Sequence, residues 1–365
     1  MIRADLNYLT AIYGKKQLHS PMVNFWSSLT KPILALAPMA GVTDTAFRQL
    51  CKGYGANVIY TEFASADALV YESKKTRELI AYHPNEQPVV CQIFGNKPEH
   101  FFKAVKILEA MGFAGVDINF GCPAYKVVKS GGGVKLMRNL NLVRELVQAA
   151  CEGTALPISI KIRASIRRGA DTKDKVEGSP DEADGFECEL DRVTALDLVR
   201  KVKDLPLAAM MLHARSYEHA FDGEPDLAMV RQVRAVCPGV LLANGGIYTP
   251  EKAQEVLEAT GADGVGIARG AWGKPWLFGQ VKSYLACGTY HSPTWDEVTA
   301  TMLRHAELAL SSKGDWGLIE LRKHLSWYIK GIPHAASLRA NLVHVKTIDD
   351  VRVALAALNP AAPMR

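Results

Sequence analysis

Eight short apolar runs, separated by amphipathic stretches, most constrain how this chain of 365 residues can fold. The runs are 33–37, 58–60, 89–93, 116–118, 158–160, 209–212, 240–242 and 265–267. Between them apolar residues recur at helical spacing, as in Phe101, Val105, Leu108 and Met111. Eight strand-then-helix units predict an α/β fold, a (β/α)8 TIM barrel over residues 31–290. A doubly wound open sheet is the alternative, but its Gly-x-Gly-x-x-Gly nucleotide-binding motif is missing from this sequence.

The carboxyl ends of the predicted strands carry polar or conformationally special residues. In a barrel these ends face the active site. In chain order the residues are Pro38 with Met39 and Ala40, Glu62, Gln92, Asn119 with Cys122, Lys161, His213, Asn244 and Arg269. Strands chosen by apolarity alone need not end in this way, so the pattern predicts an enzyme. Individual members such as Gln92 and Asn119 can also be explained as partners for backbone groups at a strand end.

Cys122 is the candidate for chemistry at the fourth strand end. It follows Asn119 on a turn that Gly121 and Pro123 constrain. An ordinary thiol has a pKa of about 8.5, so Cys122 is mostly protonated at neutral pH and can act as a general acid or as a nucleophile. Packing as a small buried hydrophobic residue is the alternative, and this motif alone leaves both open.

Two glycine-rich segments, 244–247 and 266–270, follow the last two predicted strands. Barrels commonly bind a phosphate here through backbone N–H groups, and Arg269 adds a positive charge. These segments therefore predict a phosphate-bearing cofactor. Lys161 and His213 can donate to a carbonyl or a phosphate, and Gln92 can contact a ring edge. That combination suits flavin mononucleotide (FMN).

Composition excludes several other classes of protein. The chain has no apolar run of the roughly eighteen residues that a membrane-spanning helix needs, and its N-terminus lacks the order of a secretory signal. We therefore expect a cytoplasmic protein. Seven cysteines without a Cys-x-x-Cys pair argue against disulfides and a Cys-rich zinc site, and no metal is expected. A net charge of +5 permits a polyanionic partner without requiring one.

Several motifs, in order along the chain, resemble the tRNA-dihydrouridine synthase family. They are 37–44, 61–62, 117–123, 159–163 and 268–276, followed by 321–328 and 330–331. The resemblance covers roughly residues 31–350 and implies a C-terminal helical tRNA-binding domain at 291–365. Residues 1–30 would be an N-terminal extension without a counterpart.

The resemblance implies reduction of the C5–C6 double bond of specific tRNA uridines to dihydrouridine, by FMN that NADPH reduces. It implies that Cys122 is the proton donor. It implies cofactor contacts for Pro38, Met39, Ala40, Gln92, Asn119, Lys161, His213, Asn244, Gly245, Gly246, Ala268 and Arg269. Substrate or RNA contacts are implied for Arg163, Arg215, Arg322, Lys323, His324 and Lys330.

The sequence departs from the family pattern at several places. Ala214 replaces a glycine, and its methyl group is expected to crowd the cofactor or the RNA. Gly246 stands where many members carry Asp, and Lys135 stands where a small buried residue is expected. A long insertion at about 167–191 is expected to cover the active-site face as a lid or an RNA contact, or to be a disordered insertion.

Two other functions stay open. One is an FMN barrel reductase of a free pyrimidine, of the dihydroorotate or dihydropyrimidine type, which would not require the helical domain. The other is a tRNA-binding protein without catalysis, against which the presence of Cys122, Lys161, His213 and Arg269 argues. A monomer is assumed.

Overall fold

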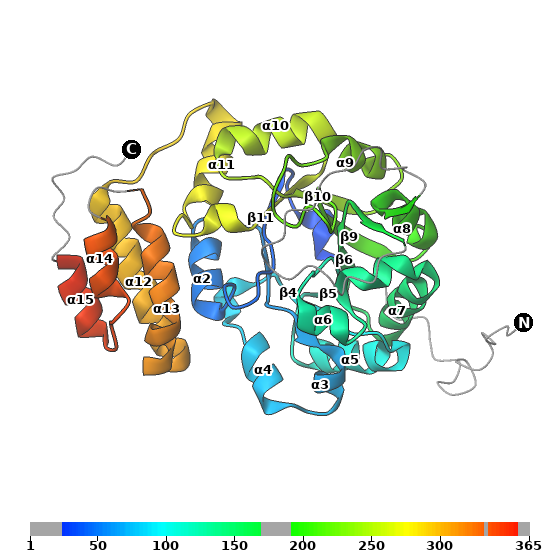
Figure 1. The fold of residues 1–365 in the computed structure, drawn as a ribbon, viewed down its shortest axis with the longest axis horizontal. Coiled ribbons are helices and arrows are strands. Elements are labelled where there is room, and N and C mark those ends of the chain that lie inside the picture. Colours follow the sequence, from blue (N-terminus) through cyan, green and yellow to red (C-terminus); the bar gives the residue numbers. More distant parts are fainter. Residues whose placement is uncertain (1–23, 169–190, 332–334, 357–365) are drawn as a thin grey trace, which may run out of the picture.

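The computed structural model describes residues 24–168, 191–331 and 335–356. Figure 1 shows strands surrounded by helices, with a helical bundle beside them. The strands that match the predicted apolar runs are β1 (Ile33–Leu36), β2 (Val58–Tyr60), β4 (Val89–Phe94), β5 (Gly115–Phe120), β6 (Ile158–Arg163), β9 (Leu207–His213), β10 (Val240–Asn244) and β11 (Gly264–Ile267). Each predicted run overlaps one of them, which confirms the predicted strands.

Parallel pairing closes these strands into a barrel. β1 pairs with β2 on one side and with β11 on the other, and β2 pairs directly with β4. The other neighbours follow the chain through β4, β5, β6, β9, β10 and β11. Within the described residues, eight parallel strands therefore form the predicted TIM barrel and exclude the open sheet.

The outer helices are α2 (Thr45–Gly53), α5 (Pro98–Ala110), α7 (Leu140–Gly153), α8 (Ala195–Val202), α9 (Leu227–Arg234), α10 (Pro250–Thr260) and α11 (Leu277–Cys287). Local sequence explains their ends. Asp44 caps α2 by accepting the Phe47 N–H, and a capping box of Thr194 and Asp197 starts α8. Gly261, at a φ of +64°, ends α10 in the left-handed conformation that glycine favours.

The amino-terminal end of the barrel is plugged by apolar side chains. Trp26, in the short 3-10 helix η1 (Phe25–Ser28), is 1% exposed. It belongs to one cluster with Ile33 and Val58, the first residues of β1 and β2. Among the described residues, apolar side chains therefore fill this end of the barrel.

The predicted insertion begins and ends in an antiparallel hairpin. Its strands are β7 (Ser165–Arg167) and β8 (Arg192–Thr194). The Arg168 N–H donates to the carbonyl of Asp191 at 2.8 Å beyond the last paired residues. Residues 169–190, on which the expected lid or RNA contact mostly falls, lie outside the described residues.

The C-terminal helical domain consists of α12 (Trp295–Lys313), α13 (Asp315–Tyr328), α14 (Ala335–Leu342) and α15 (Ile348–Ala356). Its core includes Leu321 and Leu325 of α13, and also Leu50 of α2 and Trp276, both from the barrel. The bundle lies beside α2 in Figure 1, so the two domains share this core. No helix within the described ranges is long and apolar enough to cross a membrane.

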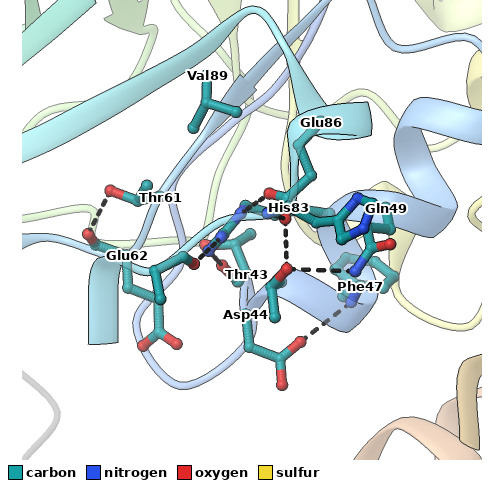
Figure 2. Close-up of polar contacts among 12 residues, drawn as sticks. Thr43, Asp44, Phe47, Gln49, Thr61, Glu62, His83, Glu86 and Val89 are labelled. Atoms are coloured by element: carbon teal, nitrogen blue, oxygen red, sulfur yellow. Dashed lines mark hydrogen bonds and ion pairs between the residues drawn. The ribbon is translucent and has the colours of Figure 1, made fainter. Parts of the chain in front are cut away.

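The loop between β1 and α2 is anchored by two buried carboxylates, of which Figure 2 shows the contacts of Glu86. Glu62 accepts the backbone N–H of Gly41, and Glu86 accepts the Thr45 hydroxyl and the His83 N–H. Glu86 also forms an ion pair with Arg48, and both of these side chains are fully buried. Because a buried ion pair is stable only when further hydrogen bonds satisfy it, this network fixes where α2 begins.

Candidate active site

A cavity of about 550 Å³ opens at the carboxyl ends of the barrel strands. All predicted cofactor residues line it: Pro38, Met39, Ala40, Gln92, Asn119, Lys161, His213, Asn244, Gly245, Gly246, Ala268 and Arg269. Cys122, Arg163 and Arg215 line the same cavity. Residues spread over more than 200 positions of sequence thus meet in one place, because the strands run parallel and close into a barrel with all their carboxyl ends at the same side.

A chain of buried hydrogen bonds runs beneath Cys122. Asp117 accepts the Ser159 hydroxyl at 2.7 Å and the Gln92 side-chain amide at 2.7 Å. The Asn119 amide donates to the Gln92 side-chain oxygen at 2.8 Å, and its own oxygen accepts the Cys122 N–H at 2.8 Å. These hydrogen bonds therefore link the buried carboxylate of Asp117 to the turn that holds the Cys122 thiol.

Sequence reasoning did not assign a role to Asp117. It stands two positions before Asn119 on β5, and side chains two apart in a strand point to the same side. That spacing was the available signal. Burial raises the pKa of Asp117 to about 6, although hydrogen bonds from Gln92 and Ser159 oppose the rise.

Cys122 lies on the cavity wall and is only partly buried, whereas Cys51, Cys91 and Cys237 are buried. Its position therefore argues against simple packing in the core. Burial raises the pKa of the Cys122 thiol, while Lys161 and Arg163 lower it by a smaller amount. A thiol that stays protonated at neutral pH favours a proton donor over a thiolate nucleophile.

Four cationic side chains line the cavity: Lys161, Arg163, Arg215 and Arg269. Burial and, to a smaller extent, the charge of Arg163 lower the pKa of Lys161 to about 8. Burial and these cations lower the pKa of His213 to about 2, so its imidazole is neutral at neutral pH. The cavity consequently favours an anionic ligand. In the described part of the chain, no group of three His, Cys, Asp or Glu side chains is arranged to bind a metal.

The wall formed by Gly245 and Gly246 fits a phosphate. Both have positive φ, +114° and +75°, which favours glycine. A Cβ on Gly245 would lie 2.9 Å from the His213 ring and 3.1 Å from Nη1 of Arg215. That Nη1 is buried and has no hydrogen-bond partner among the described residues. Because no side chain at Gly245 covers this buried, unpaired guanidinium N–H, it is suited to donate a hydrogen bond to an anion.

Ala214 and Lys135 do not have the effects expected of them. The crowding expected from Ala214 is absent because this residue does not line the cavity, and its N–H and carbonyl bond to Asn244 and Asp226. Lys135 is exposed on the 3-10 helix η3 (Gly133–Arg138), so its position does not require a small side chain.

Arg163 is 1% exposed and links two loops of the site. It donates to the carbonyls of Gly121 at 2.9 Å, and of Ser216 and Ala220 at 2.8 Å. Phe221 lies over its guanidinium at 5.6 Å and over that of Arg269 at 4.9 Å. Phe221 and Tyr248, both exposed and on the cavity wall, gave no signal in the strand pattern because they lie on loops.

The predicted RNA residues of the helical domain differ in exposure. Lys323 and Lys330 are exposed, whereas Arg322 is partly buried and donates twice to the carbonyl of Val345. His324 is 2% exposed and packs between Phe47 and His305, with ring centroids 5.0 and 4.8 Å away. His324 was expected to contact RNA. It packs inside the protein instead, because its side of α13 faces α2.

Comparison with known proteins agrees with this architecture. The family model described as dihydrouridine synthase (Dus) matches residues 35–179 and 188–362. The tRNA-dihydrouridine synthase B of Xanthomonas axonopodis pv. citri (strain 306) is 33% identical over 320 residues, 87% of this chain and 90% of that protein. The protein of the same name from Pseudomonas aeruginosa is 31% identical over 319 residues, 87% of this chain and 89% of that protein.

Among solved structures, histamine dehydrogenase from Rhizobium sp. 4-9 aligns with a TM-score of 0.49 at 10% identity, over 75% of this chain and 48% of that chain. The family model and the curated relatives span most of the chain, including both the barrel and the helical domain. This chain belongs to the dihydrouridine synthase family.

Proposed function

We propose that this protein is a tRNA-dihydrouridine synthase that binds FMN, uses NADPH as reductant and reduces the C5–C6 double bond of uridine in tRNA. The observation that carries the proposal is the partly buried, protonated thiol of Cys122 on the wall of a cationic cavity. Membership of the family and the names of the relatives support uridine in tRNA as the substrate.

The cavity residues divide into two sets toward FMN. Arg215, Asn244, Gly245, Gly246, Ala268 and Arg269 would hold the phosphate, for which the unpaired Nη1 of Arg215 is the main support. The other set, toward the ring, is Pro38, Met39, Ala40, Gln92, Asn119, Lys161 and His213. When bound, FMN supplies the hydride that uracil C6 accepts.

The chain's own residues would supply the proton and stabilise charge. Addition of hydride at C6 leaves negative charge on C5 and on the adjacent carbonyl oxygen. Cys122 would protonate C5, and its raised pKa keeps that proton available at neutral pH. Lys161 and Arg163 would stabilise the oxygen, because cations in a buried site act most strongly where charge develops.

The helical domain would bind the rest of the tRNA. A stacked uridine must leave its stack to enter the cavity, which costs a few kcal/mol. Contacts to phosphates elsewhere offset this cost, and the exposed Lys323 and Lys330 of the helical domain are suited to make them.

The decisive experiment combines the purified protein, unmodified tRNA, FMN and NADPH, and measures dihydrouridine by nucleoside mass spectrometry. Cys122→Ala should form product at least about 100-fold more slowly, since general acids contribute roughly 10²–10⁴ in rate. Cys287→Ala, at an exposed cysteine of α11 that does not line the cavity, is the matched control and should retain full activity. A flavoprotein that made no dihydrouridine in tRNA but oxidised NADPH with a free pyrimidine would overturn the proposal.

A further inference from the structure

The helical domain touches the wall of the cavity at one aromatic pair. Trp272 lines the cavity, and its ring stacks on that of Trp327 from α13, with centroids 4.4 Å apart and planes 7° from parallel. The Trp272 indole N–H is directed at the sulfur of Met39, with 3.1 Å between Nε1 and Sδ. Met39 lines the cavity as well, so Trp327 is connected to this part of the cavity wall through Trp272.

The backbone of the two domains is in equally close contact beside this pair. Gly273 has a φ of +64°, and a Cβ there would lie 2.4 Å from the carbonyl carbon of Trp327. The end of α13 therefore rests directly on the loop that follows Arg269. Any side chain at Gly273 would push the helix away from that loop.

Trp327 packs differently from its neighbours on α13. Leu321, Leu325 and Tyr328 belong to the core that the helical domain shares with α2, whereas Trp327 packs against the core of the barrel. His324, with its ring centroid 4.8 Å from that of Trp327, connects the pair to Phe47 at the start of α2. Trp327 is thus placed to hold the loops after β1 and β11 together.

Met39 needs such support because methionine has three rotatable side-chain bonds and fills space without a fixed shape. Its backbone is fixed by Thr43, whose hydroxyl accepts the Met39 N–H at 3.1 Å. Its sulfur accepts the Trp272 indole N–H, so the position of Trp272 influences where the sulfur lies. Stacking on Trp327 holds Trp272 against the sulfur and defines the wall on this side of the cavity.

We propose that Trp327 is a positioning residue of the cofactor site: by stacking on Trp272 it orders Met39, so the helical domain helps to set the affinity for FMN. The inference rests on the FMN binding that the proposed function includes. It also means that the domain proposed to bind tRNA is in mechanical contact with the cofactor wall. No sequence pattern pairs these two residues, because Trp327 lies on an amphipathic helix more than fifty positions from Trp272.

The test measures the dissociation constant of FMN from full-length protein by fluorescence titration, together with the visible circular dichroism of bound FMN. Trp327→Ala should weaken binding roughly threefold to tenfold and change the dichroism, the range expected from loss of one aromatic stack. Trp327→Phe keeps a stacking ring and should stay close to native. Trp316→Ala is the control, because Trp316 lies on the same helix, is 63% exposed and donates its indole N–H to Glu320.

The outcomes separate this inference from the proposed function. A native protein that does not bind FMN would overturn both. A native protein that binds FMN, with Trp327→Ala binding equally well, would overturn the positioning role alone. Equal losses in Trp327→Ala and Trp316→Ala would also overturn it, since they would indicate a general effect of damaging α13. Thermal unfolding of each variant confirms that the measured protein is folded.

Discussion

The side-chain oxygen of Asn119 accepts the backbone N–H of Cys122 at 2.8 Å, so a residue at the end of β5 fixes the turn that carries the thiol. The same oxygen accepts the Gly121 N–H at 3.1 Å, and the amide group donates to Gln92. Asn119 is 5% exposed and uses both of its polar atoms in this way. Its proposed contact with the cofactor therefore comes in addition to a role in holding the acid.

We expect Asn119→Ala to slow uridine reduction by about 100-fold, because a misplacement of about 1 Å at a reacting group can cost that much. The variant should also unfold more easily, since each buried polar group left unpaired costs about 1–3 kcal/mol. Single-turnover rates and urea denaturation measure the two effects. Asn119→Asp keeps the acceptor for the Cys122 N–H and should retain more activity; equal losses in the two variants would contradict the assignment.

Gly133 supports the Cys122 turn from behind. Its φ is +63°, and a Cβ there would lie 2.6 Å from the carbonyl oxygen of Cys122. Gly133→Ala should displace that turn and lower the rate of reduction. Gly261→Ala is a matched control, because Gly261 has a φ of +64° but open space around its Cβ position. Each variant should lose roughly 1–2 kcal/mol of stability from its positive φ, and Gly133→Ala should lose more because of the close contact with the Cys122 carbonyl. A rate loss shared equally by the two would contradict the role of Gly133.

The strand ends could be predicted from sequence because short apolar runs between stretches of helical spacing identify the strands. A closed parallel barrel then brings all their carboxyl ends together. Gln92, Lys161 and His213 were located in this way, and the structure places them on one cavity. The role of Asp117 could not be predicted in the same way. It depends on the register that aligns β4, β5 and β6, and thereby brings Gln92 and Ser159 to its carboxylate.

Residues of the helical domain were harder to place. A helical pattern identifies which residues of α13 share a face, but not which face meets another domain. Leu321 and Leu325 lie on the buried face of α13, whereas His324 was expected to contact RNA and is buried against Phe47. The stack of Trp272 on Trp327 depends on how the two domains dock, and no local pattern encodes that.

The buried carboxylate of Asp117 predicts a pH dependence of stability. Its pKa is raised to about 6 from an ordinary value of 3.8, so the folded state binds its proton more tightly than the unfolded state. The stabilisation from that proton is present below about pH 4 and is lost as the pH rises through about 6. Asp117→Asn removes this titration. We expect the stability of the variant relative to the native protein to increase between pH 4 and 6 and then stay constant. Urea denaturation at several pH values measures it, and a pH-independent difference would contradict the assignment.

The exposed lysines of the helical domain predict a salt dependence of tRNA binding. Lys323 and Lys330 are exposed, whereas the guanidinium of Arg322 already donates to the carbonyl of Val345. Replacing either lysine by alanine should weaken tRNA binding and reduce the slope of log affinity against log salt by roughly one, as loss of one phosphate contact does. Arg322→Ala should change the slope less, since its guanidinium already donates to the carbonyl of Val345, between α14 and α15.

Lys103→Ala is the matched control for this prediction, because it removes the same charge from an exposed position on α5 of the barrel. α5 lies across the barrel from the helical domain in Figure 1, so its slope should remain native. Affinities measured by filter binding at several salt concentrations separate a local contact from a general effect of net charge. If the three lysine variants lowered the slope equally, tRNA would be attracted by overall charge, and the helical domain would lose its assigned role in gripping the substrate.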